Sequence, residues 1–491
     1  MKKKLLVLIV AYNHEKFIGK VLDRLDDNLS NIYDTEILIN DDSSSDNTLK
    51  IIKDYTNNSK KNFKYKVLSN PVNQGYGGNQ KIGFLYAIKN GFDYVALIHG
   101  DGQYAPELLE DLVKPLDDDK LDAVFGSRMI NKNGAIKGGM PLYKYVGNKI
   151  LTAYQNLIFD KKFSEFHSGY RIYKVNSLRK IPFELNNNDH SFDNEIIIQF
   201  LLANLNIKEL PIPTYYGDEI SYVNGFKYAF QVFKANLKAK LQNYGIFYDR
   251  KYEIKNKTLS NYVFKGKFDS PHKLTIERIK NNSNVLDLGC NDLSLAENLK
   301  NKKNCNVISV DIYDNKDDKK DFIHHDLNTG LPDLNYEELD YIVMLDVIEH
   351  LDDPEKFLKS LKKKIVRNEK LKIIMSTPNI AFFIVRIMLL FGNFNYGPRG
   401  ILDKTHKRLF TFNSFEKLLS ESQFKINYIQ GIPAPYPLAV GDNFISKSLL
   451  LINKFLINFF KGIFSYQIYS EFKSETSLEL LLEKAQSKAN E

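Results

Sequence analysis

Short apolar runs alternate with longer helical stretches twice along this 491-residue chain, first up to about Ala229 and again from about Ser270. Such alternation predicts a parallel sheet with helices on both faces, so the fold class is α/β, in two domains. The runs expected to form strands are Leu5–Ala11, Glu36–Ile39, Lys66–Leu68, Tyr94–Ile98, Ala123–Phe125, Asn284–Leu288, Val307–Val310, Phe322–His324, Tyr341–Leu345 and Lys372–Met375.

The length agrees with two large domains plus smaller segments, at about 150 residues per domain. A basic, aromatic stretch, Phe226–Tyr248, and a segment rich in lysine and asparagine, Arg250–Lys267, separate the two α/β parts. We therefore expect a first domain over residues 1–229, a helical and linker segment over 230–269, a second domain over 270–440 and an apolar helical tail over 441–491.

The composition, 43% hydrophobic and 26% charged, is that of a globular chain and excludes a disordered or collagen-like one. The net charge of +8 is small for this length, and no basic run interleaved with aromatic residues suggests nucleic-acid binding. The two cysteines, Cys290 and Cys305, cannot build a disulfide framework, so a reducing cytoplasm is expected. The spacing of His and Cys along the sequence does not predict a metal site.

Membrane association is an open question in the sequence. Leu5–Ala11 is too short for a secretion signal and is better explained as a strand, and no run reaches about 18 uncharged apolar residues. In Phe444–Phe464, lysines recur every seven residues on an apolar helix. That pattern suits peripheral contact with the inner face of the cell membrane. It also suits burial against the chain's own domain or in a homodimer, and three lysines are few for an anchor, which favours burial.

Carboxylates follow a buried strand in NDDSSSDNT at residues 40–48. In open α/β sheets ligands bind at the carboxyl ends of the strands, where Asp41 and Asp42 could accept hydrogen bonds from a base or ribose. The alternative is that Ser45 or Asp46 only caps the next helix.

Three further features point to a bound diphosphate. NQGYGGNQKIG, at 73–83, places four glycines before a helix, where the backbone can approach a phosphate closely. In HGDGQYAPE, at 99–107, Asp101 follows another buried strand and can hold a divalent cation. Arg128 and Arg171 offer bidentate phosphate binding, although either alone is more often part of a structural ion pair.

The order of these motifs resembles that of the family 2 glycosyltransferases with the GT-A fold, closest to the polyprenyl-phosphate glycosyltransferase branch. The resemblance covers about residues 4–225. The motifs that carry it are AYNHE, DDSSSDNT, the glycine-rich turn, GDGQ, GSR, HSGYR, FDNE and IPTYYGDEIS.

The resemblance implies transfer of a sugar, with inversion, from a nucleotide-sugar donor to a glycan or lipid-phosphate acceptor. Asp101 would bind Mg²⁺ or Mn²⁺, and His99 stands where the family has another aspartate. Arg128 and Arg171 would bind phosphate or acceptor. A hydroxyl acceptor needs a general base, whereas an ionised phosphate needs none. The base candidates, each of which could instead anchor an arginine, are Glu165, Asp193 and Glu195. The residues implied in nucleotide-sugar binding are Tyr12, Asn13, Asp41, Asp42, Gly75, Gly78, His99, Asp101 and Gln103.

The second α/β part opens with VLDLGCND at 285–292, a strand that ends in a turn before a helix. Asp311 ends the next strand, where a carboxylate is placed for the ribose hydroxyls of an adenosine ligand. A dehydrogenase would need G-x-G-x-x-G, of which only Gly289 is present. Asn291 stands at the second glycine, and asparagine tolerates a left-handed backbone.

Together VLDLGC, VISVD, HHDLN, LDVIEHL and STPN resemble the class I S-adenosylmethionine-dependent methyltransferases over about residues 270–440. The resemblance implies that Asp287 and Gly289 line the methionine part of S-adenosylmethionine, Asp311 its ribose and Asp326 its adenine. Asp346 would form the pocket wall near the sulfonium. The histidines that could serve as a base, or be structural, are His325, His350 and His406.

We therefore expect a bifunctional transferase, with a Rossmann-like methyltransferase domain after a glycosyltransferase domain, that acts on a cell-surface polysaccharide or glycolipid. One alternative is that only one domain is catalytic and the other is a binding or docking module, which His99 and Asn291 would suit. A second alternative is a nonenzymatic scaffold.

Overall fold

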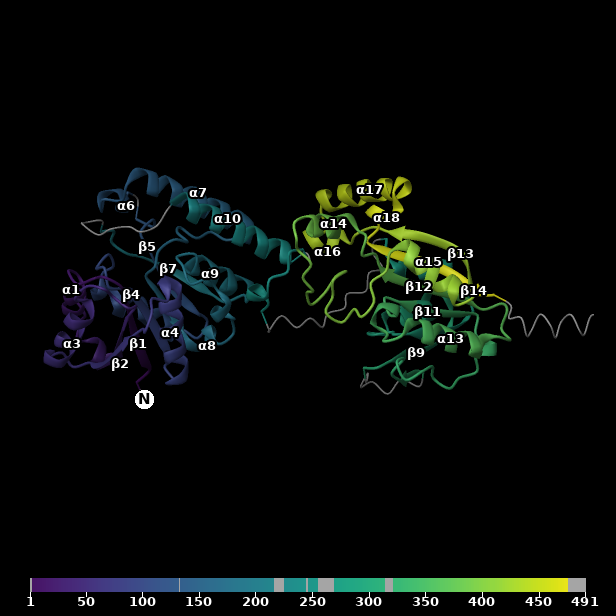
Figure 1. Cartoon of the computed structure of the whole chain (residues 1–491), viewed down its shortest axis with the longest axis horizontal. Coiled ribbons are helices and arrows are strands. Elements are labelled where there is room, and N and C mark those ends of the chain that lie inside the picture. Colours follow the sequence, from purple (N-terminus) through teal and green to yellow (C-terminus); the bar gives the residue numbers. More distant parts are fainter. Residues whose placement is uncertain are drawn as a thin grey trace, which may run out of the picture. The chain divides into compact units, whose positions relative to one another are not determined.

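The computed structural model describes residues 2–131, 133–215, 225–243, 246–254, 269–313 and 321–475. The chain divides into two compact units, Met1–Gln242 with Tyr248–Thr258 and Asn243–Phe247 with Leu259–Glu491 (Figure 1). Each unit has a seven-stranded sheet among its described residues, with helices between most strands. The predicted class, two α/β domains in one chain, is confirmed.

The sheet of the first unit has the order β3-β2-β1-β4-β6-β5-β7. All neighbours pair in parallel except β6, which runs antiparallel to β4 and β5, so the prediction of a wholly parallel sheet is wrong at this strand. The five predicted strands are present and β6 and β7 are additional. The strands are β1 Lys4–Ala11, β2 Asp34–Asp41, β3 Lys64–Ser69, β4 Tyr94–His99, β5 Ala123–Ser127, β6 Arg171–Lys174 and β7 Ile207–Pro211.

Two cores cover the two faces of this sheet. Alternate residues of a strand point to opposite faces. In β1, Leu6 and Leu8 pack in the core that contains Phe84 and Phe192, whereas Leu5, Val7 and Ile9 pack in the other core. The helices of the described residues in this unit are α1 Ile18–Asp23, α2 Leu29–Ile32, α3 Thr48–Asn58, α4 Gly75–Lys89, α5 Leu109–Val113, α6 Gly134–Lys137, α7 Leu142–Phe159, α8 Val175–Leu178, α9 Phe192–Leu202 and α10 Gly225–Gln242.

The sheet of the second unit has the order β10-β9-β8-β11-β12-β14-β13. The five predicted strands form its parallel part, and β14 runs antiparallel between β12 and β13. Apolar cores again cover both faces. The strands are β8 Asn284–Leu288, β9 Asn306–Asp311, β10 Phe322–His324, β11 Tyr341–Leu345, β12 Lys372–Pro378, β13 Phe424–Ile432 and β14 Gln467–Ser474. The helices are α11 Pro271–Arg278, α12 Ser294–Lys303, α13 Pro354–Ile365, α14 Phe383–Leu390, α15 Phe412–Glu421, α16 Tyr436–Val440, α17 Phe444–Phe459 and α18 Lys461–Phe464.

The region expected as an apolar helical tail differs from that expectation, because β14 is an interior strand of the second sheet. Its first six residues are buried, and it pairs on both sides. The tail is therefore part of the second α/β unit. Residues 476–491 of the expected tail lie outside the described residues.

Helix α17 leaves its apolar side exposed. Its buried residues are Ser446 and Asn453, whereas Phe444 is 84% exposed and Phe459 65% exposed. Asn453 accepts a hydrogen bond from the Ala434 amide at 3.0 Å and donates to the Phe464 carbonyl at 2.8 Å. The helix thus turns its polar side to the domain, so its apolar side is not buried against the described part of the chain's own domain. Over the part of the chain that is described, no helix has the length and apolar character to cross a membrane.

Candidate active sites

The carboxyl ends of β1, β2 and β4 meet at one edge of the first sheet. Ala11 pairs with Asp41 and Val10 with His99, so residues that follow these strands share that edge. Asp42 directly follows β2, and Asp101 lies two residues beyond the end of β4. The structure therefore brings together the acidic segments that lie sixty residues apart in the sequence.

Asp41 and Asp42 are both buried, but they differ in how their oxygens are used. Both oxygens of Asp42 accept hydrogen bonds, from the Asn70 amide group at 2.7 Å and from the backbone of Gln74 and Gly75 at 2.8 and 3.0 Å. Asp41 Oδ1 is buried and has no hydrogen-bond partner among the described residues. Asp42 thus orders the loop before α4, whereas Asp41 has an oxygen, Oδ1, that could accept a hydrogen bond from a ligand.

The glycine-rich turn packs against its own chain. Gly75 has φ +78°, and a Cβ added there would lie 2.7 Å from the Asn188 carbonyl oxygen. A Cβ on Gly78 would lie 2.9 Å from the Gln74 side chain, and the Gly77 amide donates to the Asn188 carbonyl at 2.7 Å. The close approach that the sequence assigned to a diphosphate is therefore made at these positions by the chain's own atoms, from backbone at Gly75 and from side chains at Gly78.

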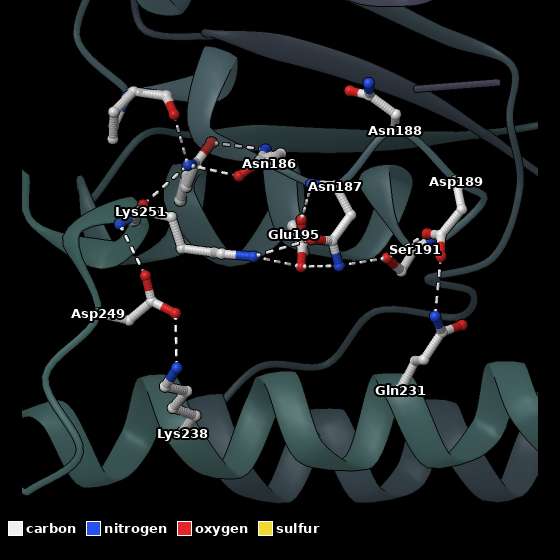
Figure 2. Close-up of polar contacts among 12 residues, drawn as sticks. Asn186, Asn187, Asn188, Asp189, Ser191, Glu195, Gln231, Lys238, Asp249 and Lys251 are labelled. Atoms are coloured by element: carbon white, nitrogen blue, oxygen red, sulfur yellow. Dashed lines mark hydrogen bonds and ion pairs between the residues drawn. The ribbon is translucent and has the colours of Figure 1, made fainter. Parts of the chain in front are cut away.

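The loop that carries Asn187 and Asn188 is held from two sides (Figure 2). Glu195 accepts hydrogen bonds from the Asn187 backbone and side chain at 2.6 and 2.9 Å and forms an ion pair with Lys251 at 2.8 Å. Gln231 of α10 donates to Asp189 at 2.8 Å. This base candidate therefore anchors a lysine and a loop, and the loop in turn fixes the N-terminus of α4.

A hydrogen-bonded chain links the two sides of this edge. The Tyr76 hydroxyl donates to Asp193 Oδ2 at 2.6 Å and lies 2.9 Å from His99 Nε2. His190 stacks on the Tyr76 ring with centroids 4.7 Å apart. Burial lowers the pKa of His99 and outweighs the opposing charge of Asp101, which keeps the imidazole neutral at pH 7.

Asp101 is half-buried beside a second histidine that the sequence did not single out. Asp101 Oδ1 accepts a hydrogen bond from the Gln103 amide at 3.0 Å. His14 Nδ1 is buried without a hydrogen-bond partner among the described residues, and it lies 2.9 Å from where a Cβ on Gly100 would be. Burial lowers the pKa of His14, against the opposing charge of Asp101. A carboxylate and a free imidazole nitrogen thus lie near each other.

Tyr12 and Asn13 lie at the same edge, after β1. Tyr12 is exposed, and Asn13 has a left-handed backbone with φ 55°. Asn13 Oδ1 accepts a 2.8 Å hydrogen bond from the Ser45 amide, and its own amide donates to Ser44 Oγ at 2.9 Å. Asn13 therefore orders the loop after β2, and Tyr12 presents a ring to solvent.

The two arginines are held in buried ion pairs. Arg128 donates through its guanidinium and, at 2.8 Å, through its backbone amide to Glu165. Burial raises the pKa of Glu165, but Arg128 and its hydrogen bonds hold that pKa below its ordinary value. Arg171 is fully buried, donates to three backbone carbonyls and lies 3.6 Å from Asp193. Glu165 and Asp193 therefore anchor arginines, as expected under the alternative to a role as general base.

In the second unit, Asp287 of β8 is 2% exposed, and its Oδ2 has no hydrogen-bond partner among the described residues. Burial, together with the charges of Asp311 and Asp292, raises the pKa of Asp287 to about 7. A buried carboxylate of this kind is stabilised by a cationic donor such as an ammonium group.

The turn after β8 has a left-handed backbone at Gly289 and at Asn291, although only the first of them is a glycine. Gly289 has φ +78°, and Asn291 is left-handed with φ 50°, as expected for its tolerance of this region. The Asn291 amide donates to Asp311 Oδ2 at 2.8 Å, and the Tyr313 amide donates to Oδ1 at 3.0 Å. Asp311 is therefore fixed at the end of β9, where the sequence placed it.

Asp326 and Asp346 lie at the same edge of the second sheet. Asp326 is half-buried and accepts a 2.9 Å hydrogen bond from the Asn328 amide. Asp346 has φ 57° and accepts hydrogen bonds from Ser376 Oγ at 2.8 Å and Gln467 Nε2 at 2.5 Å. Gln467 belongs to β14, so the unpredicted strand helps to position a predicted site residue.

Comparison with known proteins identifies both domains. A family model described as "Glycosyl transferase family 2" matches residues 6–182, and one described as "Methyltransferase domain" matches residues 261–428. A UDP-N-acetylglucosamine–dolichyl-phosphate N-acetylglucosaminyltransferase from Methanococcus voltae is 32% identical over 44% of this chain and 88% of that protein. An undecaprenyl-phosphate mannosyltransferase from Micrococcus luteus is 24% identical over 43% of this chain and 82% of that protein.

Among solved structures, glucosyl-3-phosphoglycerate synthase from Mycobacterium tuberculosis aligns over 48% of this chain and 78% of its own, with 17% identity and a TM-score of 0.37. The two family matches agree with the two α/β units and with the order in which the sequence motifs occur. The chain therefore belongs to glycosyl transferase family 2 through its first domain and carries a methyltransferase domain in its second.

Proposed function

We propose that the chain is a bifunctional transferase, in which the first domain transfers a sugar from a nucleotide-sugar and the second transfers a methyl group from S-adenosylmethionine. One shared observation carries the proposal. Each sheet has, at its carboxyl edge, a buried carboxylate oxygen without a hydrogen-bond partner among the described residues, Asp41 Oδ1 in the first and Asp287 Oδ2 in the second. An unpartnered buried acceptor is costly, and a donor group of a ligand would satisfy it.

In the first domain, Asp41 would accept a hydrogen bond from a base N–H or a ribose hydroxyl of the donor nucleotide. Asp42 and Asn13 would act by ordering the loops on either side of it, through the hydrogen bonds described above. Tyr12 is exposed and free to stack on a base. Gly75 and Gly78 would contribute by letting α4 begin close to Asn188.

The acceptor in this proposal is a lipid phosphate. Glu165 and Asp193, the predicted bases, are already engaged with Arg128 and Arg171. A phosphate oxygen is ionised at neutral pH and can attack the anomeric carbon without a general base. The bond from that carbon to the donor diphosphate then breaks as the new bond forms on the opposite face, and the nucleoside diphosphate leaves. The relatives named for dolichyl phosphate and undecaprenyl phosphate support this class of acceptor.

The cation implied by the family fits the residues at Asp101. Its carboxylate and the unpartnered Nδ1 of His14 are an oxygen and a nitrogen donor near each other. Mixed donors suit Mn²⁺ better than Mg²⁺, which prefers oxygen ligands alone. A bound cation would neutralise charge on the departing diphosphate. His99, Tyr76 and Gln103 would order the neighbouring backbone and side chains.

In the second domain, the residues also fit their proposed ligand. Asp287 Oδ2 would accept from the methionine ammonium of S-adenosylmethionine, and Asp311 would accept from its ribose hydroxyls, with Asp326 near the adenine. In methyl transfer an acceptor oxygen attacks the methyl carbon while the bond from that carbon to sulfur breaks. The sulfur leaves as a neutral thioether, and the proton of the acceptor hydroxyl passes to water. Asp346, held by Ser376 and Gln467, would line the pocket near the sulfonium.

A membrane surface is the proposed partner of α17. The exposed side of this helix carries phenylalanine, leucine and isoleucine, and Leu390 and Phe391 at the end of α14 are also exposed. The ring centroids of Phe383 of α14 and Phe464 of α18 lie 5.6 Å apart, so α14 contacts the short helix that follows α17. A lipid-phosphate acceptor resides at such a surface. Co-sedimentation with anionic vesicles should occur for the full chain and be lost in Phe455→Asp; a homodimer in place of vesicle binding would contradict this assignment.

We retain the proposed domain boundaries at residues 229 and 269. The second domain extends beyond the expected boundary at residue 440, because β14 is a strand of its sheet. The test of the proposed function is thermal stabilisation of the full chain by UDP- and GDP-sugars with Mn²⁺ and, separately, by S-adenosylmethionine. We expect stabilisation by one sugar nucleotide and by S-adenosylmethionine. Stabilisation by only one class of donor would support the single-enzyme alternative, and by neither the scaffold alternative.

A further inference from the structure

Three side chains with metal-binding atoms come together beyond β11. Glu349 and His350 lie in a short 3-10 helix, η6 (Ile348–His350), and His406 lies in the loop before α15. One ligand atom from each lies within 4.8 Å of those from the other two. In the described ranges of the chain, this is the one such group of at least three. Sequence spacing did not suggest it, because His406 is more than fifty residues from the other two.

The carboxylate of Glu349 is buried and has no cationic partner among the described residues. Glu349 is 1% exposed, and neither of its oxygens has a hydrogen-bond partner among the described residues. Asp346 and Asp403 are near enough for their charges to act on it, whereas the neighbouring Thr377 hydroxyl, itself without a hydrogen-bond partner among the described residues, favours its charged form. A buried carboxylate among like charges is strongly unfavourable unless a cation or a proton compensates it.

Each of the two histidines has its Nδ1 beside a backbone carbonyl oxygen. His350 Nδ1 lies 3.1 Å from the Thr405 carbonyl oxygen, and His406 Nδ1 lies 2.9 Å from the Ile401 carbonyl oxygen. A carbonyl oxygen only accepts, so each Nδ1 carries the proton. Each Nε2 of the neutral ring therefore keeps its lone pair. Metal-ligating histidines commonly donate their other N–H to a backbone carbonyl, which fixes the ring and its tautomer.

The backbone holds the two segments together without any ion. The amides of Lys407 and Arg408 donate to the Glu349 carbonyl at 2.8 and 3.1 Å. Lys407 also pairs with Asp352 at 2.5 Å, and Arg408 pairs with Glu355 at 2.9 Å. The three ligand side chains are thus brought near one another by contacts that do not depend on them.

We propose that Glu349, His350 and His406 form a binding site for a divalent transition metal such as Zn²⁺ or Mn²⁺. One carboxylate and two imidazole nitrogens suit such ions, and three protein ligands leave coordination positions open. A Cβ on Gly289 would lie 2.4 Å from Val347, so the segment that carries the site packs on the proposed S-adenosylmethionine turn. A metal here would coordinate the acceptor hydroxyl and favour loss of its proton; this role rests on the proposed methyl transfer.

The test is calorimetric titration of the chelator-treated full chain with Co²⁺ alone. An Asp101→Ala background removes the cation site proposed for the first domain. We expect one equivalent of Co²⁺ to bind, and Glu349→Gln, His350→Gln and His406→Gln each to weaken binding at least tenfold. His324→Gln is the matched control, since this exposed histidine also contacts a backbone carbonyl but lies outside the cluster. It should bind Co²⁺ as the parent does.

Folding of the variants is checked by urea unfolding without metal, where Glu349→Gln should be no less stable than the parent because it removes an unpartnered charge. Failure of the parent to bind Co²⁺, or equal binding by the three folded variants, would overturn the site. S-adenosylmethionine is titrated separately. Its binding without Co²⁺ binding would reject the metal site alone, and the reverse would support the metal site while rejecting the methyl-donor proposal.

Discussion

The hydroxyl of Tyr76 donates a 2.6 Å hydrogen bond to Asp193, and the same oxygen lies 2.9 Å from His99. Tyr76 belongs to α4, Asp193 to α9 and His99 to β4, so one hydroxyl joins three elements at the edge where the donor is proposed to bind. Asp193 also pairs with the buried Arg171. The arrangement therefore depends on Tyr76, which lies within the glycine-rich motif but which the sequence did not single out for a role.

Tyr76→Phe should lower both stability and sugar transfer. A hydrogen bond to a charged group contributes about 1.5–3 kcal/mol, and its loss leaves Asp193 with one donor fewer. Tyr86→Phe is the control, because Tyr86 lies on the same helix and donates a 2.6 Å hydrogen bond to Glu36. This hydrogen bond lies away from the edge of the sheet where the donor is proposed to bind. We expect urea unfolding to be affected in both variants and transfer from the sugar nucleotide in Tyr76→Phe only. Equal transfer by the two variants would contradict the assignment.

Asp41→Asn should weaken binding of the donor nucleotide at least tenfold. The substitution keeps the shape of the side chain but replaces a charged acceptor by an amide, at the position where one oxygen is free. Calorimetric titration with the nucleoside diphosphate measures the change, and Asp54→Asn on the exposed side of α3 is the control. Unchanged affinity in Asp41→Asn would show that the free oxygen does not face the nucleotide.

Asp287 should make the ligand-free protein less stable as the pH rises from about 4 to 7. The folded pKa of about 7 lies above the unfolded value near 3.9, so the folded state binds more protons in this window. Stability then falls with rising pH, by at most about 1.4 kcal/mol per pH unit for one group. Urea unfolding across this range should show the fall in the parent relative to Asp287→Asn. Parallel curves for the two proteins would contradict the raised pKa.

Gly289 and Asn291 should respond differently to substitution, although both have positive φ. Gly289→Ala adds a Cβ only 2.4 Å from Val347 and should reduce stability and binding of S-adenosylmethionine. Asn291→Gly removes no predicted ligand contact and suits the same backbone, so stability should stay within about 1 kcal/mol. Unfolding curves and S-adenosylmethionine titrations of the two variants check this. A tolerant Gly289 with a sensitive Asn291 would show that the turn is built differently.

The sequence allowed the parallel strands of both sheets other than β7 to be predicted, because most of them are runs of apolar residues next to a helix. The strands that were missed lack that signal. Arg171–Lys174 is four residues long and begins with an arginine, and Gln467–Ser474 mixes polar and apolar residues without regular alternation. Their place is decided by pairing with distant strands, β4 and β5 in one case and β12 and β13 in the other.

The candidate sites could be predicted where a carboxylate follows a strand, as with Asp41, Asp101 and Asp311, because strand order alone places such residues at one edge. Residues whose role depends on contacts across the fold could not. From the sequence, His14 is only part of the AYNHE motif and His406 only a candidate base, and the tertiary structure alone puts them beside Asp101 and Glu349. The engagement of Glu165 with Arg128 is likewise a matter of tertiary contact.

The central claim is that two domains of one chain bind two different activated donors independently. It is tested most directly by titrating the parent, Asp41→Asn and Asp287→Asn with the stabilising sugar nucleotide and with S-adenosylmethionine. The account predicts that Asp41→Asn loses affinity only for the sugar nucleotide and Asp287→Asn only for S-adenosylmethionine. If the folded parent binds one donor and not the other, or if each variant loses both donors equally, two independent sites do not exist.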